Sequence, residues 1–231
     1  MGKQIVITGA SRGIGFETAR ILADLGHSVI AVSRSEDGLK KLQSTSAGRI
    51  IPLSLDLTRP DSVQRIIDLI LKETGGVDAL IHNAGLLINK PFPELTDSDW
   101  MDQWQLNVMI PVRLTRELLP YLNPEAHIVN IGSMGGFQGS SKFPGLSAYS
   151  VTKGALSILT ECLSAELASQ KVSVNCLCLG AVQTEMLEQA FPGYQAPLNP
   201  GEMGEFIANF TLNGHQFING KILPVALNNP G

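Results

Sequence analysis

The sequence predicts an α/β protein: a single domain built on a doubly wound parallel β-sheet of about seven strands, with helices on both faces. Short runs rich in β-branched residues alternate along the whole chain with longer segments of helical periodicity. A chain of 231 residues can bury one sizeable core, and no linker or internal repeat divides it. We therefore expect residues 1–231 to form one domain.

The predicted strands and helices alternate in order. The first strand lies in KQIVITG, and apolar residues then follow helical spacing from Ile14 to Leu25, with a stop at Gly26. A long helix is expected over residues 98–122, bent at Pro111, because proline lacks a backbone donor. A proline in the last strand indicates an edge position. The other strands are expected at residues 27–34, 49–57, 77–85, 126–133, 172–180 and 220–227, and the other helices at residues 35–43, 61–73, 149–170, 184–191 and 202–213.

Composition excludes several classes of protein. The net charge is −4 and no run of five basic residues occurs, so nucleic acid and anionic membranes are not expected partners. No apolar stretch reaches the length of about 18 residues that spans a bilayer, and no signal pattern is seen, so we expect a cytoplasmic protein. Cys162, Cys176 and Cys178 are expected to be reduced and to pack rather than to bind metal, so no metal site is predicted.

A glycine-rich turn follows the first strand. In TGASRGIG, Gly9, Gly13 and Gly15 lead into a helix. Glycine suits such a turn because some positions need backbone angles that side chains resist, and others let the main chain approach a phosphate. The start of the helix adds free N–H donors and the positive end of a dipole. An ordinary tight turn is the alternative, but three glycines so close together favour dinucleotide binding.

Further motifs follow in order: NAG at residues 83–85, an asparagine in QLNVMIP, and a tyrosine four residues before a lysine in YSVTK. With its T-G-x-x-x-G-x-G turn, the sequence resembles the short-chain dehydrogenase/reductase family over about residues 4–187. The resemblance implies a Rossmann-type fold and a catalytic tetrad of Asn107, Ser133, Tyr149 and Lys153. The cofactor-binding residues it implies are Gly9, Ser11, Arg12, Gly13, Ile14, Gly15, Ser33, Arg34, Asp56, Leu57, Asn83, Ala84, Gly85, Tyr149, Lys153, Gly180, Val182 and Thr184.

The spacing of Tyr149 and Lys153 also has a chemical reason. A free phenol, with a pKa of about 10, is a poor acid or base at neutral pH, and a nearby ammonium lowers that pKa. Residues four apart share one helix face, which brings the two side chains together. Taken alone, such a pair usually marks only a helix surface. Asn107 alone would indicate a cap or kink beside Pro111, whereas the resemblance implies that it holds a water in a proton relay.

The end of the second strand bears on cofactor choice. An acid there would bind the ribose 2′-hydroxyl of NAD, and a base would accept the 2′-phosphate of NADP. Ser33 and Arg34 stand at this point, and Arg12 is a second cation expected in the same region, while Glu36 and Asp37 come too late in the chain. Stacking of either guanidinium on the adenine is the alternative. The sequence therefore favours NADP(H) over NAD(H).

Two departures from the family bear on the predicted site. About three extra residues stand around residues 140–143, between Ser133 and Tyr149; Ser140 or Ser141 could replace Ser133, but neither directly follows the strand. Leu179 replaces the usual proline before Gly180. Residues 185–215 are expected to form a small substrate lid, with residues 191–201 as its most mobile part.

These features predict an NADPH-dependent oxidoreductase acting on a carbonyl or secondary alcohol, such as a 3-oxoacyl thioester or a small ketone. A non-catalytic NADP(H)-binding regulatory protein is the alternative, although it would have no use for the tetrad. Sugar-nucleotide epimerisation normally needs a larger C-terminal domain. The helix that starts at Tyr149 is apolar around most of its circumference, so we also predict a homodimer or homotetramer.

Overall fold

The computed structural model describes residues 2–46 and 48–227 and contains one seven-stranded sheet. The strand order is β3-β2-β1-β4-β5-β6-β7, and every neighbouring pair is parallel. This confirms the predicted α/β fold. The order reverses between β1 and β4, and in such sheets ligands bind beyond the carboxyl ends of the strands at the reversal. The strands are β1 Gln4–Thr8, β2 Ser28–Ser33, β3 Ile50–Ser54, β4 Val77–His82, β5 Leu122–Ser133, β6 Ser173–Leu179 and β7 Ile222–Val225.

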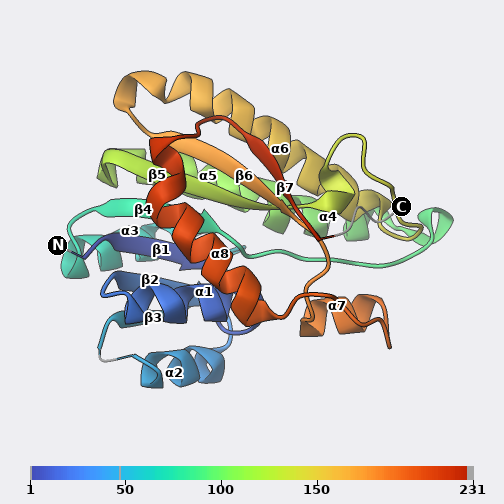
Figure 1. Ribbon diagram of the computed structural model, residues 1–231, viewed down its shortest axis with the longest axis horizontal. Coiled ribbons are helices and arrows are strands. Elements are labelled where there is room, and N and C mark those ends of the chain that lie inside the picture. Colours follow the sequence, from blue (N-terminus) through green and yellow to red (C-terminus); the bar gives the residue numbers. More distant parts are fainter. Residues whose placement is uncertain (1, 47, 228–231) are drawn as a thin grey trace.

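Helices cover both faces of the sheet (Figure 1). Because side chains alternate along a strand, Ile5 and Ile7 pack with α1, α2 and α8, whereas Val6 packs with α3 and α5. The carboxyl ends of the strands lie at the right of Figure 1, near α7 and α4. Within the described residues, no helix is long and apolar enough to cross a membrane. The helices are α1 Gly13–Asp24, α2 Glu36–Ser44, α3 Ser62–Glu73, α4 Asp97–Trp104, α5 Ile110–Leu118, α6 Ser147–Glu166, α7 Glu185–Ala190 and α8 Pro200–Asn213.

The long helix expected over residues 98–122 is interrupted. α4 passes into one π-helical segment, Gln105–Met109, before α5 begins. Pro111 cannot donate to the carbonyl four residues earlier, and single wide turns of this kind often occur at functional sites. The helical run ends before residue 122, because Leu122 already belongs to β5. Pro224 lies in β7, at the edge of the sheet, as the sequence predicts.

Candidate active site

The glycine turn between β1 and α1 lies against the NAG motif. Gly9 has φ +72°, and a Cβ there would stand 2.9 Å from Cα of Ala84. A Cβ at Gly15 would stand 2.5 Å from the carbonyl oxygen of Gly9 and would also overlap Nδ2 of Asn83. Nδ2 of Asn83 donates to the carbonyl oxygens of Thr8, at 3.0 Å, and of Gly9, at 3.1 Å. The structure thus holds the two motifs together with no space for larger residues at Gly9 and Gly15.

The start of α1 offers donors to a phosphate. Its N-cap residue, Arg12, has an extended backbone, and its side chain makes no capping hydrogen bond among the described residues. The first helical residue, Gly13, has φ +58°. Main-chain N–H groups at the first turn are therefore left for an anion, and the positive end of the helix dipole favours one. The turn and helix fit the diphosphate of a nicotinamide dinucleotide.

The predicted adenosine end is built from β2, β3 and α2. Oγ of Ser33 donates to Oγ of Ser11 at 2.8 Å. Asp56 accepts hydrogen bonds from N of Thr58, at 2.9 Å, and from Oγ1 of Thr58, at 2.7 Å, and these bonds lower the pKa of the carboxyl group. Leu57 beside it is buried. The carboxylate of Asp56 is thus ionised and fixed in direction.

Arg12 differs from expectation. The sequence places its guanidinium in the same region as Arg34, but in the structure it forms an ion pair with Glu185 at the start of α7. Both side chains are more than half exposed, so the ion pair contributes little to stability. It nevertheless directs the guanidinium of Arg12 toward Glu185. Ile14 packs against the apolar core of the α1 face.

Three residues of the predicted tetrad meet at the carboxyl end of β5. Ser133 is the last residue of that strand, and Tyr149 and Lys153 come from the first turns of α6. Nζ of Lys153 lies 5.8 Å from the centroid of the Tyr149 ring and donates to the carbonyl oxygen of Ile131 at 2.8 Å. Ser140, the alternative to Ser133, instead donates to the carbonyl oxygens of Met134 and Phe137 within its own loop.

Burial dominates the electrostatics of this group. It raises the pKa of Tyr149 to about 12, although hydrogen bonding with Ser133 opposes the rise. It lowers the pKa of Lys153 to about 8. The phenol pKa is therefore raised, rather than lowered as the spacing suggested, because desolvation disfavours the charged forms of both Tyr149 and Lys153.

Asn107 lies in the π-helical segment and is 1% exposed. Its Oδ1 accepts from N of Leu86 at 2.8 Å, and its Nδ2 donates to the carbonyl oxygen of Leu86 at 2.9 Å. Nδ2 also donates to Oγ1 of Thr152, on α6, at 2.9 Å. The buried amide is thus satisfied by the segment after β4 and by the helix that carries Tyr149.

Gly85, the last residue of the NAG motif, lies beside two residues of the predicted tetrad. A Cβ there would stand 3.4 Å from Oδ1 of Asn107 and 3.5 Å from Nζ of Lys153. Thr8 is a further residue of this region that the sequence motifs did not single out: its Oγ1 accepts from the N–H groups of Asn83 and Ala84, both at 3.1 Å. Its position as the first residue of the T-G motif was the available signal.

The segment after β6 leads from the sheet to α7. Leu179 is the last residue of β6 and pairs with Ser133 on one side and Val225 on the other. N of Gly180 donates to the carbonyl oxygen of Val225 at 2.9 Å. Val182 is buried and Thr184 caps α7 by accepting from N of Leu187 at 3.2 Å.

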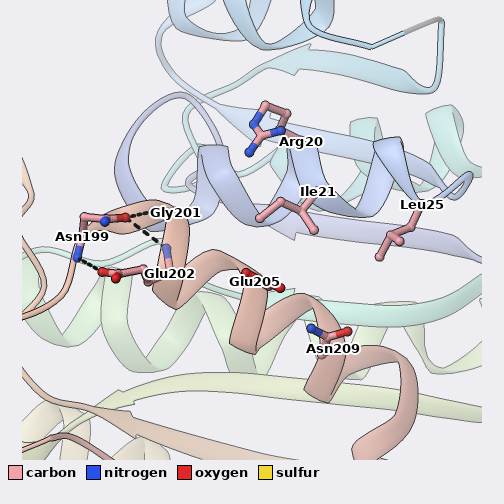
Figure 2. Close-up of a pocket in the computed structure, with 8 residues that line it drawn as sticks. All are labelled: Arg20, Ile21, Leu25, Asn199, Gly201, Glu202, Glu205 and Asn209. Carbon is pink, nitrogen blue, oxygen red and sulfur yellow. Dashed lines mark hydrogen bonds between the residues drawn. The ribbon is translucent and has the colours of Figure 1, made fainter.

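Two other features lie outside this group. Cys176 and Cys178 are buried, with their sulfur atoms 3.8 Å and 3.7 Å from Oγ of Ser157. Among the described residues, no three His, Cys, Asp or Glu side chains form a group that could hold a metal ion. A groove of about 430 Å³ runs between α1 and α8, and none of the predicted site residues lines it (Figure 2).

Comparisons with known proteins agree with this geometry. The model of the short chain dehydrogenase family matches residues 3–195. The 3-oxoacyl-[acyl-carrier-protein] reductase of Vibrio cholerae is 31% identical over 187 residues, which are 80% of this chain and 75% of that protein. The fatty acyl-CoA reductase of Acinetobacter baylyi is 32% identical over 214 residues, which are 89% of this chain and 72% of that protein.

Solved structures are similar over nearly the whole chain. The Brucella melitensis 3-ketoacyl-(acyl-carrier-protein) reductase complexed with NADH has a TM-score of 0.88 at 26% identity, covering 97% of this chain and 96% of that one. L-sorbose reductase from Gluconobacter frateurii, complexed with NADPH and L-sorbose, has the same TM-score and identity and covers 99% and 96%. The chain therefore belongs to the short-chain dehydrogenase/reductase family of oxidoreductases, which act on carbonyl and alcohol groups with a nicotinamide cofactor.

Proposed function

We propose that this protein is an NADPH-dependent reductase that transfers hydride to the carbonyl group of a small-molecule substrate. One observation carries the proposal: Ser133, Tyr149 and Lys153 meet at the carboxyl end of β5, and Gly85 links this group to the glycine turn. A protein that only bound the dinucleotide would need the turn but not these three side chains.

Each side chain has a role that follows from its position. The hydroxyl of Ser133 hydrogen-bonds the substrate oxygen and holds the carbonyl in place. Tyr149 gives its proton to that oxygen as the alcohol forms, and Lys153 stabilises the phenolate that remains. Asn107 keeps Lys153 connected to solvent for proton replacement. The bound nicotinamide supplies the hydride.

The preference for NADPH rests on the end of β2. Ser33 and Arg34 stand there, no acidic residue does, and Ser35 caps α2 through Oγ. Glu36, the first acidic residue after β2, is paired with Lys40 at 2.7 Å. A 2′-phosphate would therefore meet a hydroxyl, a guanidinium and the start of a nine-residue helix. Solved relatives bind NADH in one case and NADPH in another, so the relatives support a nicotinamide but not this choice.

We propose that the other predicted cofactor-binding residues also contact the cofactor, because they lie around the glycine turn and Thr184. The substrate is proposed to be a 3-oxoacyl thioester or a smaller ketone, on the similarity to 3-oxoacyl reductases. Residues 185–215 are proposed as the lid. Within them, Leu198 is bridged to Val182, and the carbonyl of Leu198 accepts from N of Gln183 at 2.8 Å. These contacts anchor Leu198 to the segment after β6, so we propose that the lid moves only before Leu198.

Assembly into a homodimer or homotetramer is proposed from α6. Val151 and Ile158 on this helix are 50% and 59% exposed, which is costly for large apolar side chains in water. Light scattering at micromolar concentration tests this, and a monomer would contradict it. Substitution of Ile158 by glutamate should then dissociate the assembly.

A panel of ketones and 3-oxo esters, assayed by the loss of reduced nicotinamide absorbance, tests the proposed reaction. NADPH and NADH are compared at equal concentration. We expect turnover with NADPH at higher kcat/KM than with NADH. Tight NADPH binding without turnover of any carbonyl would instead indicate a regulatory protein.

A further inference from the structure

Three segments far apart in the sequence meet at one point near the start of α6. Nδ2 of Asn89 donates to the carbonyl oxygen of Ala190, at the end of α7, at 2.7 Å. N of Lys90 donates to the carbonyl oxygen of Gly145 at 3.1 Å. The rings of Phe143 and Phe191 contact edge to face, with centroids 6.5 Å apart. We call Asn89, Phe143, Gly145, Ala190 and Phe191 the mouth.

Two of these segments run to the mouth from the nucleotide turn. The first starts at Asn83, which binds the carbonyl of Gly9, and passes Asn107 through both main-chain groups of Leu86. The second is α7, whose Thr184 Cγ2 lies 3.5 Å from the Cβ position of Gly13. Both segments therefore span the distance from the proposed cofactor site to the mouth.

The third segment leads directly into the catalytic helix. Gly145 stands two residues before the start of α6 and four before Tyr149. It has φ +87°, and a Cβ there would overlap Oδ1 of Asn89. The side chain of Asn89 therefore contacts the loop before Tyr149 and the end of α7 together. The mouth is therefore the point at which the three segments meet, and one of them leads directly into the helix that carries Tyr149.

Each charged side chain of the three segments at the mouth already has a partner. Residues 86–91, 142–146 and 184–193 contain four of them. Nζ of Lys90 pairs with Asp99 at 2.8 Å, and Glu185 pairs with Arg12. Nζ of Lys142 donates to Phe137 and Ser140 of its own loop at 2.7 Å to 3.2 Å. Oε1 of Glu188 accepts from N of Gly193 at 3.0 Å.

Most of the other side chains of these segments are apolar: Leu86, Leu87, Ile88, Pro91, Phe143, Pro144, Leu146, Met186, Leu187, Ala190, Phe191 and Pro192. Asn89, Thr184 and Gln189 are polar and uncharged.

We propose that the mouth admits the substrate and selects carbonyl compounds whose far end is uncharged and apolar, such as an alkyl or aryl group. Phe143 and Phe191 are the specificity-determining residues, and Asn89 is a positioning residue that holds their two segments together. A carboxylate or a polyol would have to lose water at the mouth without a free charge to replace it. This inference rests on the proposed carbonyl reduction and names the substrate class for it.

The test compares substrates that share a reacting carbonyl but differ at the far end. An alkyl 3-oxo ester, the matching 3-oxo carboxylate, an aryl methyl ketone and a ketose are assayed with NADPH. We expect kcat/KM for the ester to exceed that for the carboxylate by at least about tenfold, because the carboxylate loses solvation without a partner. The aryl ketone should also exceed the ketose.

Alanine substitutions of Phe143 and Phe191 then test whether these two side chains select the substrate. Each should raise KM for the aryl ketone about two- to tenfold, the range that one aromatic contact gives, and leave kcat within about twofold. The double substitution should add little beyond the larger single effect, since either change breaks the same ring contact. Phe217→Ala, a substitution of a phenylalanine that is 84% exposed and remote in sequence, is the matched control and should change neither constant.

Asn89→Ala should raise KM for the aryl ketone like the phenylalanine variants. NADPH affinity, measured by fluorescence, should stay unchanged in all variants and also reports that they are folded. Phe143→Leu and Phe191→Leu, which keep an apolar side chain, should retain the preference for ester over carboxylate.

Two results are distinguishable. Equal kcat/KM for ester and carboxylate would contradict the proposed selection at the mouth, and so would phenylalanine variants that change KM equally for all substrates. Either result would leave the proposed carbonyl reduction intact. NADPH binding without turnover of any carbonyl would remove the proposed function, and the mouth with it.

Discussion

Oγ1 of Thr152 accepts a hydrogen bond from Nδ2 of Asn107 at 2.9 Å and donates to the carbonyl oxygen of Tyr149 at 2.8 Å. The hydroxyl is fully buried, and its one hydrogen is used within α6, so it faces Asn107 as an acceptor. Thr152 therefore links the π-helical segment to the helix that carries Tyr149 and Lys153.

Replacing Thr152 by valine should separate these two elements. Valine has nearly the same shape but leaves an N–H of Asn107 without this buried acceptor, so we expect the free energy of unfolding to fall by about 1–3 kcal/mol. Misplacement of the proposed catalytic groups should lower kcat by about tenfold to a hundredfold. Denaturant titration and steady-state kinetics measure the two effects. Thr152→Ser keeps the hydroxyl and should retain most of the stability and most of kcat. Losses in the serine variant equal to those in the valine variant would contradict the role of the hydrogen bond.

Gly15→Ala should abolish dinucleotide binding. The added methyl group would overlap Asn83 and the Gly9 carbonyl, which pushes the NAG segment away from the turn. Calorimetric titration with NADPH should show affinity lowered at least about a hundredfold, since the turn itself must shift. Gly26→Ala is the control: Gly26 has a positive φ but open space around it, so the substitution should cost stability and leave affinity intact. Normal binding by the Gly15 variant would show that this turn is not the phosphate site.

Stability should fall in mild acid because of His127. Burial lowers its pKa from 6.5 to about 4, helped by the charges of His215 and Lys3, while its hydrogen bond with the Thr211 carbonyl opposes the shift. The unfolded state therefore binds more protons between these values, so stability is fully present above about pH 6.5 and is lost as the pH falls toward 4. The loss is about 3 kcal/mol at most.

Urea unfolding at several pH values measures this loss. His82, whose pKa is lowered to about 3, titrates in the same direction, so the informative quantity is the difference in slope between the wild type and His127→Gln. The variant should show a shallower dependence on pH. Equal slopes would mean that His127 does not supply the difference in bound protons.

Arg34→Ala should reduce the preference for NADPH. The lost guanidinium would have bound the 2′-phosphate, and hydrogen bonds to charged groups contribute about 1.5–3 kcal/mol, which predicts affinity lowered about tenfold or more for NADPH and unchanged for NADH. Arg12→Ala, compared directly, should have the smaller effect because Arg12 is paired with Glu185. An unchanged preference in Arg34→Ala would remove this residue from the cofactor site.

The sheet, the glycine turn and the edge position of Pro224 could be predicted because each depends on neighbouring residues in the sequence. The tetrad could be predicted only through the resemblance. The partner of Asn107 lies 45 residues away, the partner of Arg12 lies 173 away, and Asn89 and Ala190 are 101 apart. Such contacts are set by packing, and nothing in the local pattern indicates them. The raised pKa of Tyr149 was missed for the same reason, because it depends on burial by distant segments.

The central claim is that Tyr149 transfers the proton during carbonyl reduction. Its most direct test is the steady-state rate of NADPH-dependent reduction of a 3-oxo ester by Tyr149→Phe, with NADPH affinity measured in parallel. The account predicts that NADPH binds with unchanged affinity while kcat falls at least about a hundredfold, because the ring remains and only the proton donor is lost. Full activity in Tyr149→Phe would contradict it.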